Sequence, residues 1–310
     1  MKLLIVDKMH ESLLPMLEKI GIEGDYCPQI SKSEIKTKLP NYEGLVVRSK
    51  VFVDQDLIKN CHRLKVVCRA GAGIDNLDVG YLTERNIKII NAPEGNRNAV
   101  AEHCLGLVFS LLNNIVKSHI EISKYKWDRE ENRGTEIGNK TIGILGYGFM
   151  GSAVAEKFSK LGCRVIAYDK YKSDFTDEWV EEVSLEKLYK ETDILSIHVP
   201  LTAETSMMVS DHFINQFNKN IWLVNTSRGE IVRLTHLIDN IATGKIKAAA
   251  LDVLENEKIE RLNEDEHEVF KKLISFDQVI LTPHIAGWTY ESYEKINMVL
   301  VKKLKNFLQV

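Results

Sequence analysis

The sequence lacks several features that would place it in other classes of protein. It has 5 cysteines but no C-x-x-C pair, and scattered thiols are typical of reduced cysteines rather than of disulfides or a metal cluster. No apolar run has membrane-spanning length, and the amino-terminal MKLLIVDKMHE becomes charged too early for a signal peptide. Its 41 Lys and Arg against 44 Asp and Glu form no block of like charge. We therefore expect a soluble, cytoplasmic protein without a metal site that binds neither nucleic acid nor membrane.

What is present is an alternation of short apolar runs and amphipathic segments along almost the whole chain. With 310 residues the chain is long for one hydrophobic core, so two domains are expected. The alternation predicts an α/β protein with parallel sheets. In such sheets ligands bind beyond the carboxyl ends of the strands, so the residues that directly follow each apolar run are the functional candidates.

The strongest single motif is TIGILGYGFMG, residues 141 to 151, in which an apolar run passes into a G-x-G-x-x-G turn that opens a helix. Gly146 permits the tight turn, Gly148 lets the backbone approach a pyrophosphate, and Gly151 lets helix and strand pack closely. The free N–H groups at the start of that helix, expected from Ser152 to Leu161, would then point at the phosphates, and Phe149 and Met150 of the turn are cofactor-binding candidates. A glycine turn in a doubly wound sheet that binds nothing is the alternative.

An acidic residue in the expected place strengthens the dinucleotide interpretation. The next apolar run ends in Asp169, eighteen residues after the last glycine, where the fingerprint has its ribose-binding acid. A carboxylate there favours NAD over NADP because it repels a 2′-phosphate. Lys170 and Lys172 keep the use of NADP open.

A second glycine turn, RAGAGIDN at residues 69 to 76, differs from the first. Asn76 stands where the third glycine would be, and no acid follows the next apolar run, residues 87 to 90. We interpret this segment either as a loop that offers the N–H groups of Ala72 and Gly73 to a small anion or as a structural turn.

Hydride transfer to or from a nicotinamide needs an acid/base group and a cation that holds the substrate. Two histidines, His198 and His284, follow predicted strands, and spacing alone does not separate them. Arg228 follows another strand and is suited to bidentate binding of a carboxylate, although an arginine there is often part of a surface ion pair.

The longest helical pattern in the chain predicts one helix from Ala99 to about Tyr125. A polar, irregular segment follows, and its lone Trp127 is expected at a subunit or domain contact.

Several motifs together resemble the D-isomer-specific 2-hydroxyacid dehydrogenase family over nearly the whole length. The matching segments, in the order of the family, are CRAGAGIDNLD (68 to 78), NAPEGNRNAVAEH (91 to 103), WDR (127 to 129), TIGILGYGFMG, HVPLTAET (198 to 205), NTSRGE (225 to 230), LDVLENE (251 to 257) and LTPHIAG (281 to 287). This resemblance implies NAD as cofactor, a Rossmann-type domain and a flavodoxin-like α/β substrate domain. It also implies a homodimer that uses the helix after Asn98 and the Trp127 region.

The resemblance assigns roles that spacing left open. It makes His284 the acid/base, Glu257 its partner, Arg228 the substrate-binding arginine and Asp252 the acid that holds the nicotinamide carboxamide. Further cofactor-binding candidates are His198, Pro200, Thr205, Thr226, Ser227 and Gly287. The implied domains are residues 1–98 with 285–310 for substrate and 99–284 for NAD, with hinges near Asn98 and between His284 and Trp288.

Within the family the sequence most resembles phosphoglycerate dehydrogenases of serine biosynthesis. Arg48, Ser49 and Lys50 resemble their substrate loop, in which cations could hold a phosphate. Because the chain stops at Val310, we expect no regulatory domain and no feedback by serine. Lys258, where the family usually has proline, and Trp288, where many relatives have a small residue, could reshape the substrate pocket. The alternatives are a glyoxylate or hydroxypyruvate reductase and an NAD(H)-sensing binding protein on the same fold.

Overall fold

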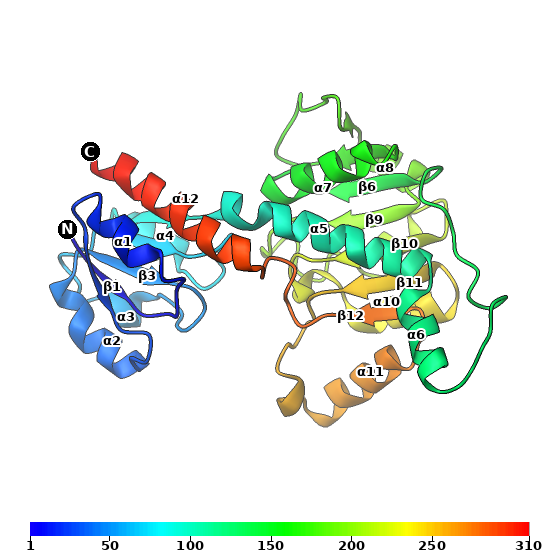
Figure 1. Cartoon of the computed structure of the whole chain (residues 1–310), viewed down its shortest axis with the longest axis horizontal. Helices are drawn as coiled ribbons and strands as arrows, with labels where there is room; N and C mark the ends of the chain where they lie inside the picture. The colour runs from blue at the N-terminus through cyan, green and yellow to red at the C-terminus, as the bar shows by residue number, and fades with distance from the viewer. Residues whose placement is uncertain (310) are drawn as a thin grey trace. The chain divides into compact units, whose positions relative to one another are not determined.

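The computed structural model describes residues 1–309, and the chain divides into two compact units. Unit 1 consists of Met1–Arg97 together with the segment from Trp288 onward, and unit 2 is Asn98–Gly287 (Figure 1). The sequence expectation placed these boundaries at 98/99 and 284/285. Unit 1 is therefore discontinuous in sequence, and α5 (Pro93–Leu112) begins in unit 1 and continues into unit 2.

Unit 1 contains a parallel sheet of five strands in the order β2-β1-β3-β4-β5, which is the flavodoxin-like order. The strands are β1 (Lys2–Ile5), β2 (Glu23–Tyr26), β3 (Gly44–Val47), β4 (Val66–Arg69) and β5 (Lys88–Asn91). The helices are α1 (Leu13–Glu18), α2 (Lys32–Lys38), α3 (Gln55–Ile58), α4 (Val79–Glu84) and α12 (Tyr290–Leu308), with the 3-10 turn η1 (Leu39–Asn41). A capping box of Ser31 and Glu34 starts α2.

Successive strand residues point to opposite sides of this sheet, and both sides carry apolar side chains. Helices therefore cover both faces. Leu4, Leu45 and Val67 belong to a core that includes residues of α2, α3 and α4. On the other face, Leu3 and Val46 pack with residues of α1 and α12. The last helix is thus an integral part of the core of unit 1, although nearly the whole chain separates it from β1.

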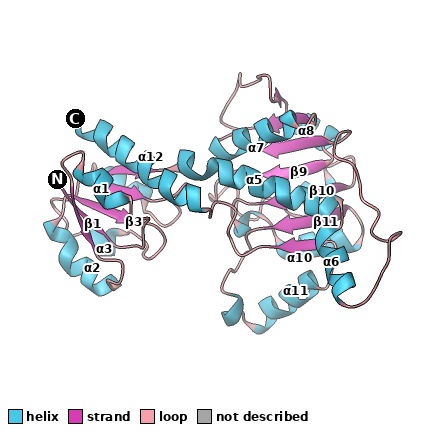
Figure 2. Cartoon of the chain, in the orientation of Figure 1, coloured by secondary structure: helices cyan, strands magenta, loops and turns pink. Residues whose placement is uncertain are grey.

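Unit 2 contains a parallel sheet of seven strands in the order β12-β11-β10-β9-β6-β7-β8. Figure 2 labels β9, β10 and β11 of this sheet. The strands are β6 (Thr141–Leu145), β7 (Arg164–Tyr168), β8 (Glu181–Glu182), β9 (Ile194–Ile197), β10 (Ile221–Asn225), β11 (Ile246–Leu251) and β12 (Val279–Leu281). The first strand in sequence lies inside the sheet, between β9 and β7, so the strand order reverses at β6. A ligand site is expected at such a reversal, beyond the carboxyl ends of the strands.

Helices cover both faces of the second sheet as well. The additional elements are α6 (Ile115–Ser123), α7 (Phe149–Lys160), α8 (Leu185–Glu191), α9 (Asp211–Asn215), α10 (Leu234–Ala242), α11 (Glu264–Ile274) and the 3-10 turns η2 (Gly229–Ile231) and η3 (Ile259–Arg261). Residues of α5 and α7 share one core with the sheet. Residues of α8 to α11 share the other. This is a doubly wound, Rossmann-type architecture, as the sequence predicts.

Three local features differ from the sequence expectations. The predicted helix from Ala99 to Tyr125 is broken after Leu112, because Asn114 adopts a left-handed conformation (φ 52°) that asparagine tolerates better than most residues, and α6 begins after it. The charged stretch after Glu255, for which no helix was expected, contains α11, which starts at a capping box of Asn263 and Glu266. The polar edge strand β2 was not expected.

No single helix within residues 1–309 has the length and apolar composition needed to cross a membrane; only α5 and α6 together meet that test, and they are bent by 60°. The same residues contain no group of three or more His, Cys, Asp or Glu side chains that could hold a metal ion.

Candidate active site

The glycine turn after β6 has a separate physical reason for each glycine. Gly146 has φ 95°, and a Cβ on it would lie 2.9 Å from the backbone of His198 and Val199. A Cβ on Gly151 would lie 2.1 Å from the carbonyl oxygen of Gly146, so any side chain there would force α7 away from the strand. A Cβ on Gly148 would meet nothing within 4 Å. The backbone at Gly148 is therefore open to a ligand, next to the first N–H groups of α7, and this cradle fits a pyrophosphate.

Asp169, at the carboxyl end of β7, fastens the glycine turn to its own loop. One carboxylate oxygen accepts from the N–H of Tyr147 (2.8 Å), and the other accepts from the N–H groups of Tyr171 (2.9 Å) and Lys172 (3.1 Å). The Lys172 ammonium donates to the carbonyl of Tyr147 (2.9 Å), and Lys170 pairs with Glu204. Both lysines that left the use of NADP open are thus engaged within the protein.

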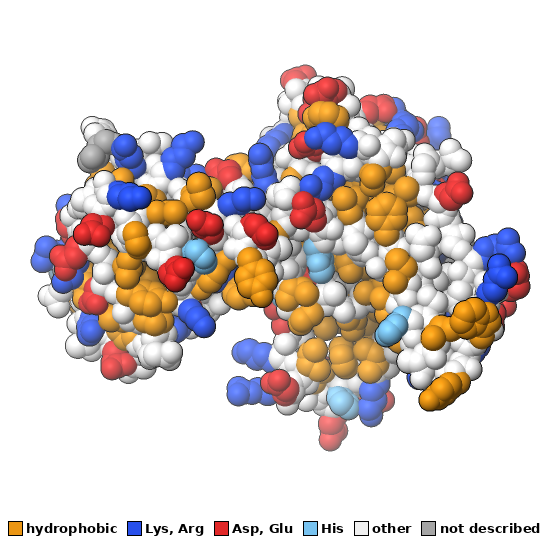
Figure 3. All heavy atoms as spheres, viewed as in Figure 1, with side chains coloured by type: hydrophobic (Ala, Val, Ile, Leu, Met, Phe, Trp, Pro, Cys, Tyr) orange, Lys and Arg blue, Asp and Glu red, His pale blue; other side chains and the backbone are white. Residues whose placement is uncertain are grey.

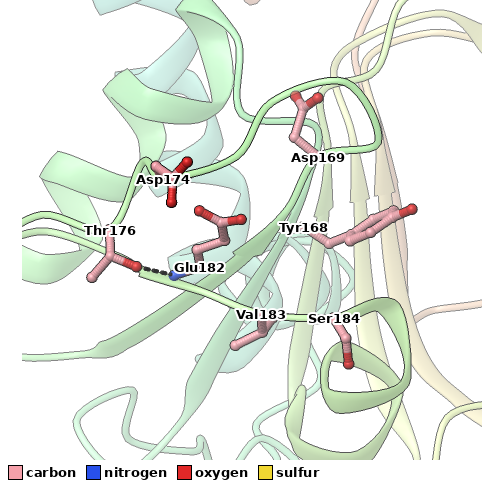
Figure 4. A pocket seen from close by; sticks show the side chains of 7 residues that line it. All are labelled: Tyr168, Asp169, Asp174, Thr176, Glu182, Val183 and Ser184. Carbon is pink, nitrogen blue, oxygen red and sulfur yellow. Dashed lines mark hydrogen bonds between the residues drawn. The ribbon is translucent and has the colours of Figure 1, made fainter.

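An open hollow of about 730 Å³ adjoins Asp169 (Figure 4). Figure 4 shows the carboxylates of Asp169, Asp174 and Glu182 around it, and the hydroxyl of Thr176, which accepts from the N–H of Glu182 (3.0 Å). Three carboxylates close together repel an additional phosphate. This lining favours a ribose with free hydroxyl groups over a 2′-phosphorylated one.

His198 follows β9 and is held as a neutral ring. Its Nε2 lies 2.7 Å from the Ser196 hydroxyl, and burial lowers the pKa of His198 from 6.5 to about 3, because the charged form would lose hydration. Ser196 also interacts with the Cys104 thiol, which lies 3.3 Å from the Thr226 hydroxyl. Burial raises the pKa of Cys104 to about 12. A ring that stays neutral is unsuited to deliver a proton, so of the two strand-end histidines His284 is the better acid/base candidate.

Asn225, at the end of β10, shapes the loop that carries Arg228. Its side chain is fully buried, accepts from the N–H of Ser227 (3.0 Å) and donates to the carbonyl of Arg228 (2.9 Å). A Cβ on Gly229 would lie 1.9 Å from the backbone of Leu254. The loops after β10 and β11 are therefore in direct backbone contact, which only glycine allows at this point.

His284 and Glu257 form the expected pair. The His284 Nδ1 lies 2.9 Å and 3.0 Å from the two Glu257 oxygens, and the side chains are 45% and 48% exposed. His284 has a left-handed backbone (φ 55°), held by its N–H donating to the carbonyl of Asp252 (2.8 Å). Nδ1 is thus engaged by the carboxylate, so a proton exchanged with a ligand would have to use Nε2.

Asp252, at the end of β11, anchors the segment that carries His284. Its buried carboxylate accepts from the hydroxyl of Thr282 (2.5 Å) and from the N–H groups of Ile285 (2.9 Å) and Ala286 (2.8 Å). Burial acts to raise the pKa of Asp252, but the contact with His103 and these three hydrogen bonds hold it below the usual value. One oxygen also lies 3.5 Å from Nε2 of His103. The binding of a nicotinamide carboxamide by Asp252 stays a prediction.

Two polar residues of these sites were not predicted. His103 contacts Thr282 (3.1 Å) from α5, and only its place in the matching NAPEGNRNAVAEH segment could have drawn attention to it. Asp7 follows β1 and is almost fully buried, with a carboxylate oxygen that accepts from the N–H of Arg48 (2.6 Å). An acid directly after a buried strand is the signal that could have identified Asp7.

The predicted substrate residues of unit 1 follow β3 and β4, which are neighbouring strands. Ser49 is exposed, and the Lys50 ammonium donates to the carbonyl oxygens of Pro28 and Ile30, which leave its charge unneutralised. Among the hydrogen bonds found within residues 1–309, the backbone N–H groups of Ala72 and Gly73 donate to no acceptor. They are available to an anion.

Arg48 contacts the aromatic start of α12. Its guanidinium carbon lies 4.3 Å from the ring centroid of Trp288 and 4.8 Å from that of Tyr293. Trp288 was expected to reshape the substrate pocket, and it contacts a predicted substrate residue, Arg48.

Apolar side chains gather on the surface of α6 and the segment after it (Figure 3). Ile115, Ile120 and Ile122 are 51%, 44% and 49% exposed, and Trp127 is 80% exposed. A hollow of about 190 Å³ lies between α6 and Trp127.

Comparisons with known proteins agree with this geometry. Residues 105–286 match the family model described as D-isomer specific 2-hydroxyacid dehydrogenase, NAD binding domain. Hydroxypyruvate reductase of Thermotoga maritima is 34% identical over 299 residues, which cover 96% of this chain and 94% of that protein. D-3-phosphoglycerate dehydrogenase of Archaeoglobus fulgidus is 33% identical over 308 residues, which cover 99% of this chain. The aligned part is 57% of that relative, so the chain spans little more than half of its length.

A solved structure extends the likeness to the whole fold. A D-lactate dehydrogenase from Aquifex aeolicus, complexed with NAD and lactic acid, superposes with a TM-score of 0.83 at 26% identity. The superposition covers 100% of this chain and 96% of that one.

Proposed function

The chain belongs to the D-isomer-specific 2-hydroxyacid dehydrogenase family and is an NAD-dependent oxidoreductase, and from that premise we propose that it oxidises 3-phosphoglycerate at the 2-hydroxyl, the entry step of serine biosynthesis. The observation that carries the substrate assignment is the Arg48-Ser49-Lys50 loop, because its two cations lack a carboxylate partner among the described residues and suit a phosphate.

In the proposed mechanism, bound NAD supplies the hydride acceptor for the hydrogen on C2. His284 takes the hydroxyl proton on Nε2, while Glu257 on Nδ1 fixes the ring and stabilises the positive charge that the ring acquires. Arg228 binds the substrate carboxylate, and the N–H groups of Ala72 and Gly73 complete its hydrogen bonds. In the reverse direction, protonated His284 returns the proton to the carbonyl oxygen.

The cofactor residues divide by the part of NAD that they would bind. We propose the N–H groups of Phe149 and Met150, with Gly148, for the pyrophosphate and Asp169 for the adenosine ribose. The remaining predicted contacts lie in the segments that follow β9 to β12, which adjoin in the sheet: Pro200, Thr205, Thr226, Ser227, Asp252 and Gly287. His198, as a neutral ring, would act there as a hydrogen-bonding group.

Reduction of hydroxypyruvate or glyoxylate is the second candidate, favoured by the match to nearly the full length of the Thermotoga maritima reductase. A panel of 2-hydroxy and 2-keto acids, followed by NADH absorbance, separates the two. We expect kcat/KM to be highest for 3-phosphoglycerate and 3-phosphohydroxypyruvate. A higher kcat/KM for hydroxypyruvate than for its phosphorylated form would refute the primary proposal.

A homodimer in the cytoplasm completes the proposal. The exposed apolar side chains of α6 and Trp127 are suited to burial against a second copy, and all 5 cysteines are free thiols, as a reducing compartment requires. Light scattering after gel filtration should give the mass of a dimer, and Trp127→Ala should shift the equilibrium towards the monomer. A monomeric wild-type protein at micromolar concentration would contradict this.

A further inference from the structure

Trp288 and Tyr293 form an aromatic platform against which the Arg48 guanidinium is seated. The two rings are within 28° of parallel with their centroids 6.1 Å apart, and the guanidinium carbon lies 4.3 Å and 4.8 Å from them. In the triangle that these three distances define, the angle at the guanidinium carbon is close to a right angle. The cation therefore rests against both rings and is not enclosed between them, so part of its N–H edge stays available to a ligand.

The platform is fixed by the surrounding packing of unit 1. Tyr293 is partly buried and meets the ring of His10 edge to face, with centroids 5.6 Å apart. Asn297, one helical turn further along α12, is fully buried and donates to the carbonyl of His10 (3.1 Å) and the hydroxyl of Ser12 (3.0 Å). The first turns of α12 are thus tied to the loop that follows β1.

The backbone of Arg48 is held from the opposite side. Its N–H donates to the buried Asp7 carboxylate (2.6 Å), and its carbonyl accepts from the Asn76 side chain (3.0 Å). A long arginine side chain normally loses considerable rotamer entropy when it binds a ligand. Here both ends of the side chain are positioned before any ligand arrives.

Partial desolvation strengthens the binding of an anion by the Arg48 guanidinium. Burial lowers the pKa of Arg48 from its usual value, with Asp7 and Tyr293 acting in the opposite direction, and the group still carries its charge at neutral pH. A partly desolvated guanidinium that lacks a carboxylate in ion-pair contact among the described residues gains more from binding an anion than a hydrated one does.

We propose that Trp288 is a specificity-determining positioning residue that, with Tyr293, holds Arg48 ready for a second anionic group of the substrate, such as a phosphate, remote from the reacting carbonyl. This inference rests on the proposed function, since it assigns Arg48 to the substrate. Trp288 acts through Arg48 and does not itself take part in hydride or proton transfer.

Trp288 is 64% exposed, so its truncation leaves no large internal cavity and the fold should tolerate it. Tyr290, two residues further on, is 95% exposed and has no ring partner among the described residues, so Tyr290→Ala is the matched control. Trp288→Phe keeps an aromatic face and serves as the conservative variant.

The test measures kcat and KM for 3-phosphohydroxypyruvate and for hydroxypyruvate, which lacks the second anion, with NADH in excess. For Trp288→Ala we expect KM for the phosphorylated substrate to rise about tenfold, as the loss of a partly desolvated cation–π contact implies, with kcat nearly unchanged. KM for hydroxypyruvate should change little. Trp288→Phe should keep KM for the phosphorylated substrate close to the wild-type value, and Tyr290→Ala should behave as wild type.

A double-mutant cycle decides whether the effect passes through Arg48. In an Arg48→Ala background, Trp288→Ala should cause no further rise in KM. Two results would overturn the platform inference and leave the proposed function standing. One is full additivity of the two substitutions in KM. The other is that Arg48→Ala loses the discrimination between the phosphorylated and unphosphorylated substrates while Trp288→Ala keeps it. A wild-type enzyme that does not discriminate between the two substrates would overturn both.

Discussion

The neutral His198 makes the stability of unit 2 depend on pH in a way that can be calculated. In the folded chain the pKa of His198 is lowered to about 3, against 6.5 for an exposed ring, because burial penalises the imidazolium. As the pH falls below 6.5, the unfolded chain binds a proton that the folded chain does not. The free energy of unfolding therefore decreases on acidification, and this loss continues until the pH reaches the folded-state value near 3.

The size of the effect follows from the difference between the two pKa values. Between pH 7 and pH 5 the unfolded state gains about 2 kcal/mol from protonation of this one ring. The ring is partly accessible to solvent, so this figure is the upper end of the expected range. The neighbouring Cys104 thiol, with its pKa near 12, does not titrate in this interval.

His198→Gln removes the titrating group while an amide can still bond to the Ser196 hydroxyl. Urea unfolding at pH 7 and pH 5 should show a smaller loss of stability in the variant than in wild type, by up to about 2 kcal/mol. Tryptophan fluorescence is a suitable probe because Trp127, Trp179 and Trp222 lie in unit 2. His267→Gln, an exposed residue of the same unit, is the control. Equal losses in wild type and His198→Gln would refute the reasoning.

Three further predictions concern the site. His284→Ala should lower kcat by a factor of about 10² to 10⁴ and leave the Kd for NADH nearly unchanged by fluorescence titration, whereas wild-type turnover would remove His284 from the mechanism. Gly151→Ala should cost about 1–3 kcal/mol of stability and weaken NADH binding, because its Cβ would lie 2.1 Å from the Gly146 carbonyl; unchanged melting and affinity would contradict the close packing. Asp169→Ala should reduce the preference for NAD over NADP about tenfold in kcat/KM, and an unaltered ratio would argue against its ribose role.

Much of the fold was predictable because local patterns determine it. Buried parallel strands are continuous apolar runs, as in β6 and β9, and the fingerprint glycines combine turn, helix start and close packing in six residues. The strand-end rule identified Arg228 and both histidines as candidates. It did not choose between the histidines, because the burial that keeps His198 neutral is a property of the tertiary structure that spacing along the chain does not report.

The features that were missed depend on long-range contacts or on weak local signals. The contact of Arg48 with Trp288 joins residues 240 positions apart, and no periodicity reports it. The polar sequence of β2 does not read as a strand, because at the sheet edge it needs little apolar surface. The break before α6 depends on a single left-handed asparagine. The capping box of Asn263 and Glu266 was a local signal for the start of α11, a helix that was not expected.

The place of α12 in the core of unit 1 has a consequence for how the chain matures on the ribosome. A polypeptide emerges from its amino terminus, so Asn98–Gly287 is available as one uninterrupted segment before α12 has been translated. Until then the sheet face that includes Leu3 and Val46 lacks the cover of Ile296, Leu300 and Leu304. The part of the protein that is synthesised first is therefore completed last, and during that interval it exposes an apolar surface on which chaperones can act.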